Sequence, residues 1–193
     1  MHGLIFASLH DYATVRLGEE RAAELWEDRV FEPTETYDDA WFAAQLERLA
    51  AAIGESRADI ERGFGSFAAQ GTFAELFPGY YEESADTFAF LLGIEEKIHE
   101  VVRATIRGAS PPMLHVRALS DLGVLVSYTS ERGLCTLLEG LVLGTAEHYG
   151  EEVSVEELQC MHRGDPGCVF SIQRRGEVMP GHASRSSNDL LGG

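Results

Sequence analysis

Two adjacent prolines, Pro111 and Pro112, divide the chain into parts with different hydrophobic patterns. Proline lacks a backbone N–H and restricts the residue before it, so no helix continues through Ser110-Pro111-Pro112. Up to about residue 107 the apolar residues recur at helical spacing, and beyond it they alternate as in strands. We therefore expect a helical part followed by a part built on a sheet.

The spacing predicts helices over residues 2–17, 19–29, 38–53, 56–69 and 94–107, with shorter turns over 72–78 and 84–92. In the second part it predicts strands over 113–118, 123–128, 153–161 and 168–173, and one helix over 134–149. The fold class is therefore α+β, with an N-terminal helical subdomain packed on a C-terminal subdomain that has a four-stranded antiparallel sheet and a crossing helix. From Arg174 the sequence is rich in Gly, Ser and Asn, and residues 174–193 are expected to be a flexible tail.

The charge balance excludes some partners. The 193 residues carry 15 Lys and Arg against 32 Asp and Glu, a formal net charge of −17. A nucleic acid or an anionic membrane surface would meet net repulsion. The sequence has no apolar run of transmembrane length and no positively charged leader, so we expect a cytoplasmic protein. Its three cysteines would then be thiols or metal ligands.

The end of the predicted strand over 123–128 carries a polar pattern. Side chains alternate along a strand, which places Tyr128, Ser130 and Arg132 on one face and Thr129 on the other. A phenol, a hydroxyl and a guanidinium together make a clamp for a carboxylate. The same pattern also fits an exposed strand end with ordinary polar residues.

His99 lies on the predicted helix over 94–107, beside an apolar stripe that includes Ile98 and Val102. A neutral imidazole in such a place can be an axial ligand of heme iron. For an isolated histidine, a partly buried or solvent-facing residue without a ligand is the more common explanation of such a pattern. No nucleophile elbow, phosphate loop or spaced carboxylate pair is present, so an enzyme is not expected.

Taken together, these patterns resemble the heme nitric oxide and oxygen binding (H-NOX) family, related to the heme domain of soluble guanylate cyclase. The motifs that carry the resemblance are Met1-His2-Gly3-Leu4-Ile5, Phe73-Ala74-Glu75-Leu76-Phe77-Pro78, Phe90-Leu91-Leu92, His99, Gly108-Ala109-Ser110-Pro111-Pro112, Tyr128-Thr129-Ser130-Glu131-Arg132 and Cys168-Val169-Phe170. The resemblance implies one heme domain over residues 1–173, with a distal subdomain over 1–70, a proximal one over 71–173, and heme b between them.

Carried over by position, the resemblance makes His99 the proximal iron ligand and assigns the heme propionates to Tyr128, Ser130 and Arg132. Pro112 would press on the porphyrin. The remaining candidates for packing around the ring are apolar: Ile5, Phe73, Leu137 and Leu141.

The resemblance also implies a function, namely sensing NO at ferrous heme, with CO as a second ligand. Oxygen-binding members carry a distal tyrosine where this chain has Leu137, and Leu9 and Ala69 are also apolar, so we expect no stable oxygen complex. Release of His99 on NO binding would pass the signal to a separate protein such as a histidine kinase or a cyclic-di-GMP enzyme.

The cysteines suggest a second site. The spacing of Cys135, Cys160 and Cys168 resembles a zinc site of some H-NOX proteins, with His162 or Glu157 as the fourth ligand. Three semi-buried thiols are the simpler interpretation. Two alternative functions follow: a thiol or zinc redox sensor of the same fold, or a relative that binds a small molecule without gas chemistry.

Overall fold

The proline pair lies between the last helix of the N-terminal part and the first strand, as the sequence predicts. The computed structural model describes residues 1–27, 29, 31–32, 34–106 and 108–175. Before the prolines the described chain is helical, and after them it forms a four-stranded antiparallel sheet and one long helix. The predicted fold class is confirmed.

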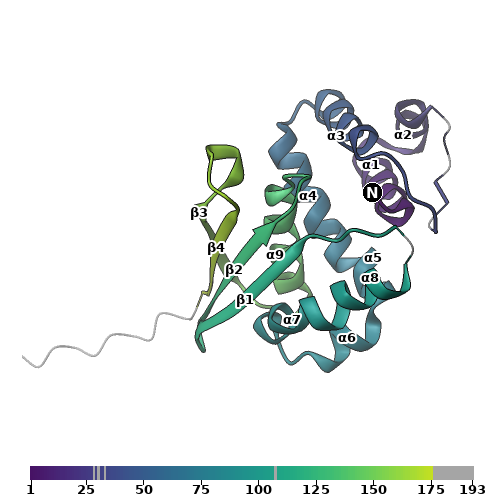
Figure 1. Ribbon diagram of the computed structural model, residues 1–193. Helices are drawn as coiled ribbons and strands as arrows, with labels where there is room; N and C mark the ends of the chain where they lie inside the picture. Colours follow the sequence, from purple (N-terminus) through teal and green to yellow (C-terminus); the bar gives the residue numbers. More distant parts are fainter. Residues whose placement is uncertain (28, 30, 33, 107, 176–193) are drawn as a thin grey trace, which may run out of the picture.

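The helices of the first part are arranged as an N-terminal group and a group that precedes the sheet (Figure 1). Their bounds are α1 (Gly3–Leu17), α2 (Glu19–Trp26), α3 (Asp39–Ile53), α4 (Arg57–Gln70), α5 (Thr72–Leu76), α6 (Pro78–Glu83), α7 (Thr87–Ile94), the π-helical turn η1 (Glu95–His99) and α8 (Glu100–Thr105). Side-chain caps define three of the starts, since Asp38 accepts from the Ala40 N–H, Ser56 from the Asp59 N–H and Asp86 from the Ala89 N–H.

The expected turn over 84–92 and helix over 94–107 are wrong in their boundaries. A helix already begins at Thr87, where the Asp86 carboxylate accepts the Ala89 N–H at 2.8 Å, and it continues through a π-turn into α8. The run Phe88-Ala89-Phe90-Leu91-Leu92 is apolar on nearly every side, so it shows no helical stripe in the sequence.

Other expected ends also differ from the structure, among them that of the first strand, which ends at Ser120 and not at residue 118. Helix α2 ends at Trp26 because Glu27 is left-handed, with φ of 54°. Strand β3 ends at Gln159, since the Cys160 N–H donates to the Asp165 carboxylate and a short 3₁₀ turn, η2 (Met161–Arg163), follows. The tail does not begin at Arg174, which is the last residue of β4; residues 176–193 lie outside the described residues.

The sheet has the strand order β1-β2-β4-β3, with each neighbouring pair antiparallel. The strands are β1 (Met113–Ser120), β2 (Gly123–Thr129), β3 (Val153–Gln159) and β4 (Cys168–Arg174). Helix α9 (Cys135–His148) connects β2 to β3 and lies along one face of the sheet (Figure 1). Strand β1 is therefore an edge strand, next to the segment that carries η1 and α8.

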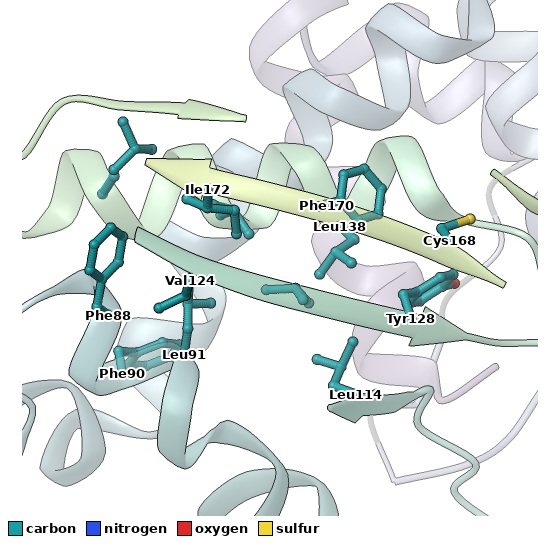
Figure 2. Close-up of a cluster of buried hydrophobic side chains, with 14 of the residues drawn as sticks. Phe88, Phe90, Leu91, Leu114, Val124, Tyr128, Leu138, Cys168, Phe170 and Ile172 are labelled. Atoms are coloured by element: carbon teal, nitrogen blue, oxygen red, sulfur yellow. The ribbon is translucent and has the colours of Figure 1, made fainter. Parts of the chain in front are cut away.

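Among the described residues, buried apolar side chains form two clusters. One lies between α1, α2, α3 and α4 and includes Phe6, Leu9, Trp26 and Phe64. The other lies between the sheet, α7 and α9, where side chains from β2 and β4 gather with Phe90, Leu91 and Leu138 (Figure 2). Helix α9 contributes to both clusters, so it joins the helical part to the sheet.

Helices α4 and α9 lie side by side with almost no side chains between them. A Cβ at Gly65 would overlap the Leu137 carbonyl oxygen, and one at Gly140 would overlap the Arg62 carbonyl oxygen. Glycine is thus required here by the close approach of two backbones. Across this contact Arg62 Nη2 also donates to the Glu139 carboxylate at 3.0 Å.

No helix in the described part of the chain is long and apolar enough to cross a membrane.

Candidate functional site

A cavity of about 260 Å³ lies between the helical part, the proline-containing loop and the sheet. Its wall is mostly apolar. The polar and charged residues that line it are His2, Tyr81, His99, Ser110, Tyr128, Ser130, Arg132 and Thr145. Among the lining residues that the structure describes, Arg132 is the only lysine or arginine. The cavity therefore suits a largely apolar ligand with an anionic group at one end.

His99 lines this cavity from the π-helical turn η1, and its side chain is 12% exposed. Its Nδ1 lies 3.0 Å from Glu95 Oε2. Burial lowers the pKa of His99, although Glu95 opposes this shift, so the imidazole is neutral near pH 7. A carboxylate only accepts hydrogen bonds, so Nδ1 carries the proton and Nε2 is left free to bind a metal.

Glu95 has three partners. Its Oε2 also accepts the Leu114 N–H at 3.1 Å, and its Oε1 accepts from Arg103. Burial alone would raise the pKa of Glu95, but the bonds from Arg103, His99 and Leu114 hold it below its ordinary value. Glu95 was not among the residues expected at the site, although an acid four positions before a histidine on a helix indicates such a contact.

Tyr128, Ser130 and Arg132 all line the cavity, but alternation along a strand is not the reason. Strand β2 ends at Thr129, and a turn follows in which the Gly133 N–H donates to the Ser130 carbonyl. The turn, not the pleat, brings Ser130 and Arg132 to the side of Tyr128. Thr129 is exposed and lies outside the lining.

The polar atoms of this group are only partly available to an anion, because Arg132 already has partners in the chain. Tyr128 Oη accepts the Leu134 N–H at 3.1 Å, which leaves its hydroxyl proton free to donate. Burial raises the pKa of Tyr128, so the phenol keeps that proton. Arg132 Nη1 donates to the Ser110 carbonyl at 2.5 Å, and Nε lies 2.8 Å from Asp39 Oδ2. Its side chain is 19% exposed.

These residues fit a heme. The cavity offers an apolar wall for the macrocycle, an imidazole with a free Nε2 for the iron, and a guanidinium with two hydroxyls for the carboxylates. The other residues expected at this site also line it: Ile5, Phe73, Pro112, Leu137 and Leu141. Ala69 lines it too.

The expectation for Leu9 is wrong, because Leu9 is fully buried in the N-terminal cluster and does not line the cavity. Two hydroxyls that sequence analysis missed are present instead. Tyr81 donates to the Ala69 carbonyl at 2.9 Å and Thr145 to the Leu141 carbonyl at 2.8 Å. A hydroxyl has one proton, so both donors are already used.

The cysteines converge at a second site. Ligand atoms of Cys135, Glu157, Cys160 and Cys168 all lie within 4.8 Å of one another, and the Cys135 and Cys160 sulfurs are 3.8 Å apart. His162 is not in the group, since its Nε2 lies 2.7 Å from the Gly133 carbonyl oxygen. Burial raises the pKa of the Cys135 thiol, with the nearby Cys168 adding to the shift.

Comparison with protein-family models shows to which family the chain belongs. The model of the haem-NO-binding family, HNOB, matches residues 2–157. The chain belongs to this family. Its members are heme-based gas-sensing domains, and the H-NOX motifs around His99 and Tyr128 fall within the matched region. No curated protein sequence matches the chain significantly.

Solved structures of H-NOX proteins match almost the whole chain. An H-NOX protein from S. oneidensis in the Fe(II)NO ligation state has 26% identity and a TM-score of 0.85, and covers 91% of this chain and 100% of its own. The SO2144 H-NOX domain from Shewanella oneidensis in the Fe(II)CO state has 26% identity, a TM-score of 0.84 and coverage of 92% and 100%. A mutant H-NOX from T. Tengcongensis at 24% identity and a TM-score of 0.81 has the same fold, with coverage of 92% and 100%.

Proposed function

We propose that this HNOB protein binds one heme b noncovalently in the cavity and responds to NO. The observation that carries the proposal is the pairing, in one cavity, of the free Nε2 of His99 with Arg132, the single cationic side chain among its described lining residues. When bound, the heme would supply a ferrous iron that takes diatomic gases. The solved S. oneidensis H-NOX structures in the NO and CO states support this choice of ligands.

In this proposal each lining residue has a defined task. His99 would bind the iron through the lone pair of Nε2, while its Nδ1–H donates to the Glu95 carboxylate. Arg132, Tyr128 and Ser130 hold the carboxylates, and Pro112 presses on the ring from the loop. When NO binds, His99 would release the iron. Loss of the bond between His99 and the iron would then change how the helical part is arranged relative to the sheet. Signalling to a partner requires such a ligand-dependent shift between two arrangements.

Selection of NO over oxygen depends on which hydrogen-bond donors face the gas in the cavity. Bound dioxygen gains from a hydrogen bond, and the position where oxygen-binding members carry a distal tyrosine is held here by Leu137. Leu137 is apolar, and the Tyr81 and Thr145 hydroxyls donate to carbonyls of the chain itself. We therefore infer that the ferrous protein binds NO and CO but forms no stable oxygen complex. The signalling partner would be a separate protein, a histidine kinase or a cyclic-di-GMP enzyme.

The decisive experiment is the absorption spectrum of the protein purified with heme. His99→Gly should lose the ferrous five-coordinate spectrum and regain it with free imidazole, whereas His115→Gly on the exposed side of β1 should not change it. An unchanged spectrum in His99→Gly would refute the ligand. A stable oxygen spectrum in aerobic titration would refute the proposed gas selectivity while leaving heme binding intact.

A second candidate function concerns the cysteine group. A tetrahedral zinc ion with bonds of about 2.3 Å places two sulfurs about 3.8 Å apart, and this matches the distance between Cys135 and Cys160. We propose that Cys135, Cys160, Cys168 and Glu157 can hold Zn²⁺ and that oxidation of the thiols releases it. Metal analysis of the reduced and the oxidised protein tests this proposal.

A further inference from the structure

The π-helical turn η1 spans Glu95 to His99 and so begins and ends at the two residues that contact each other across it. Its closing bond runs from the Glu100 N–H to the Glu95 carbonyl, five residues back. Single π-turns inside α-helices are rare and often occur at functional sites. Here the irregular turn sets the backbone on which the His99 imidazole and the Glu95 carboxylate meet at 3.0 Å.

The contact is held from several sides. Arg103, eight residues further along the same helical segment, donates to the second oxygen of Glu95. The Leu114 N–H reaches Oε2 from β1, across the proline loop. Two donors from separate positions therefore hold the carboxylate in place, and it in turn holds the imidazole. A partner fixed in this way keeps the rotamer and the tautomer of a histidine constant.

We propose that Glu95 is a positioning residue for His99, which fixes the Nδ1–H tautomer, makes Nε2 a stronger iron donor, and ties the ligand to strand β1 through the Leu114 N–H. This inference rests on the proposed function, since it names what controls the iron ligand of that site. Histidine ligands that donate to a carboxylate are more basic toward a metal, and loss of such partners typically costs 10- to 100-fold in metal affinity.

The second half of the proposal follows from the sharing of one oxygen atom. Glu95 Oε2 accepts both the His99 Nδ1–H and the Leu114 N–H. A displacement of the imidazole must either carry the carboxylate along or break one of these two bonds. Because β1 is an edge strand, its Leu114 N–H has this side-chain partner where an inner strand would have a backbone carbonyl. Glu95 is thus a direct hydrogen-bonded link between the ligand helix and the sheet.

The matched variants are Glu95→Gln and Glu96→Gln. Glu96 is the exposed neighbour on the same turn. Glutamine keeps the length of Glu95 but replaces the carboxylate with a neutral acceptor. In heme-loaded protein, Glu95→Gln should lower the frequency of the iron–histidine stretch, speed heme loss on the order of tenfold, and release His99 more completely when NO is added. Glu96→Gln should match the wild type in all three.

Two measurements need no heme and test the proposal even if heme binding fails. The ¹⁵N shifts of His99 in the heme-free wild-type chain should show a protonated Nδ1, and hydrogen exchange at the Leu114 amide should be on the order of tenfold faster in Glu95→Gln than in Glu96→Gln. A protonated Nε2 in the wild type would overturn the proposal, as would an unchanged Leu114 exchange rate or an unchanged iron–histidine frequency. Glu95→Asp, one methylene shorter, gives a charged variant should the glutamine variant not fold.

Discussion

Arg132, in the turn after β2, and Asp39, in the first turn of α3, form an ion pair that joins the sheet-containing part to the helical part, with 2.8 Å between Nε and Oδ2. The same guanidinium holds the Ser110 carbonyl of the proline loop. Three segments that are distant in sequence therefore meet at one side chain. Burial would raise the pKa of Asp39, but its bonds to the N-terminal ammonium and Arg132 lower it, which keeps the pair charged.

The first prediction follows from this geometry. Arg132→Ala should speed heme loss on the order of tenfold, because it removes a charge-assisted hydrogen-bond donor to the heme carboxylates. Partial solvent exposure reduces the contribution of this donor to heme affinity. Thr129→Ala is the control, since Thr129 is exposed and outside the cavity. Transfer of heme to a high-affinity acceptor protein measures both rates. Equal rates in the two variants would contradict the role of Arg132 as an anchor.

The contact between α4 and α9 yields a prediction about stability. Gly140→Ala should lower the free energy of unfolding by about 1–3 kcal/mol, because the added methyl group would overlap the Arg62 carbonyl and force the backbones apart. Gly79→Ala on α6 is the control, since a Cβ there meets nothing within 4 Å. Urea unfolding of the two variants checks the difference. A neutral Gly140→Ala would show that the two helices separate easily.

Asp86 gives a prediction with a defined pH dependence. The Ala89 N–H bond lowers its pKa below the ordinary 3.8 despite burial, and Arg174 adds to the shift. A depressed carboxyl pKa stabilises the fold at pH values above 3.8 and ceases to do so as the pH falls through the depressed value. Asp86→Asn, which keeps the cap acceptor, should therefore cost about 0.5–1 kcal/mol at pH 7 and nothing in strong acid.

Thermal unfolding of Asp86→Asn as a function of pH tests this prediction. Glu82→Gln on α6 serves as the control because Glu82 is exposed. Its difference from the wild type should be small at every pH. A stability gap for Asp86→Asn that stays constant down to pH 3 would mean that the charge of Asp86 contributes nothing.

The cysteine site offers two candidates for the fourth zinc ligand, His162 and Glu157, and metal analysis can distinguish them. Protein purified under reducing conditions should contain one equivalent of zinc, and His162→Ala should retain it, because His162 lies outside the ligand group. Glu157→Gln should weaken zinc binding. Elemental analysis after dialysis against a chelator measures both. Absence of zinc from the reduced wild type would leave Cys135, Cys160 and Cys168 as buried thiols.

Much of the fold could be predicted because its signals are local. Pro111 and Pro112 by themselves prevent a helix from continuing. The alternation of Val124, Val126 and Tyr128 directly indicates the buried face of β2. The start of α7 could not be found in this way. Phe88, Phe90 and Leu91 are buried in the cluster with α9 and the sheet, and the exposed positions hold Ala89 and Leu92, so the pattern has no polar side to mark a helix.

At the site, residue types were easier to predict than contacts. His99 and Arg132 lie in the cavity as expected, yet the ion pair with Asp39 links positions 93 residues apart, and no spacing rule reaches that far. The structure places Glu157, and not His162, beside the three cysteines, and the reason is again a contact between distant parts of the chain. The short turn at Met161–Arg163 redirects the chain after Cys160, and the imidazole is drawn to the Gly133 carbonyl.

The backbone contact between α4 and α9 restricts how this protein can evolve. Where side chains meet, a larger residue on one side can be accepted once a smaller one appears on the other. Gly65 and Gly140 instead face main-chain atoms of the opposite helix, and no substitution removes a carbonyl oxygen. Neither position has a side-chain partner that could compensate, so a larger residue at either glycine requires the two helices to move apart.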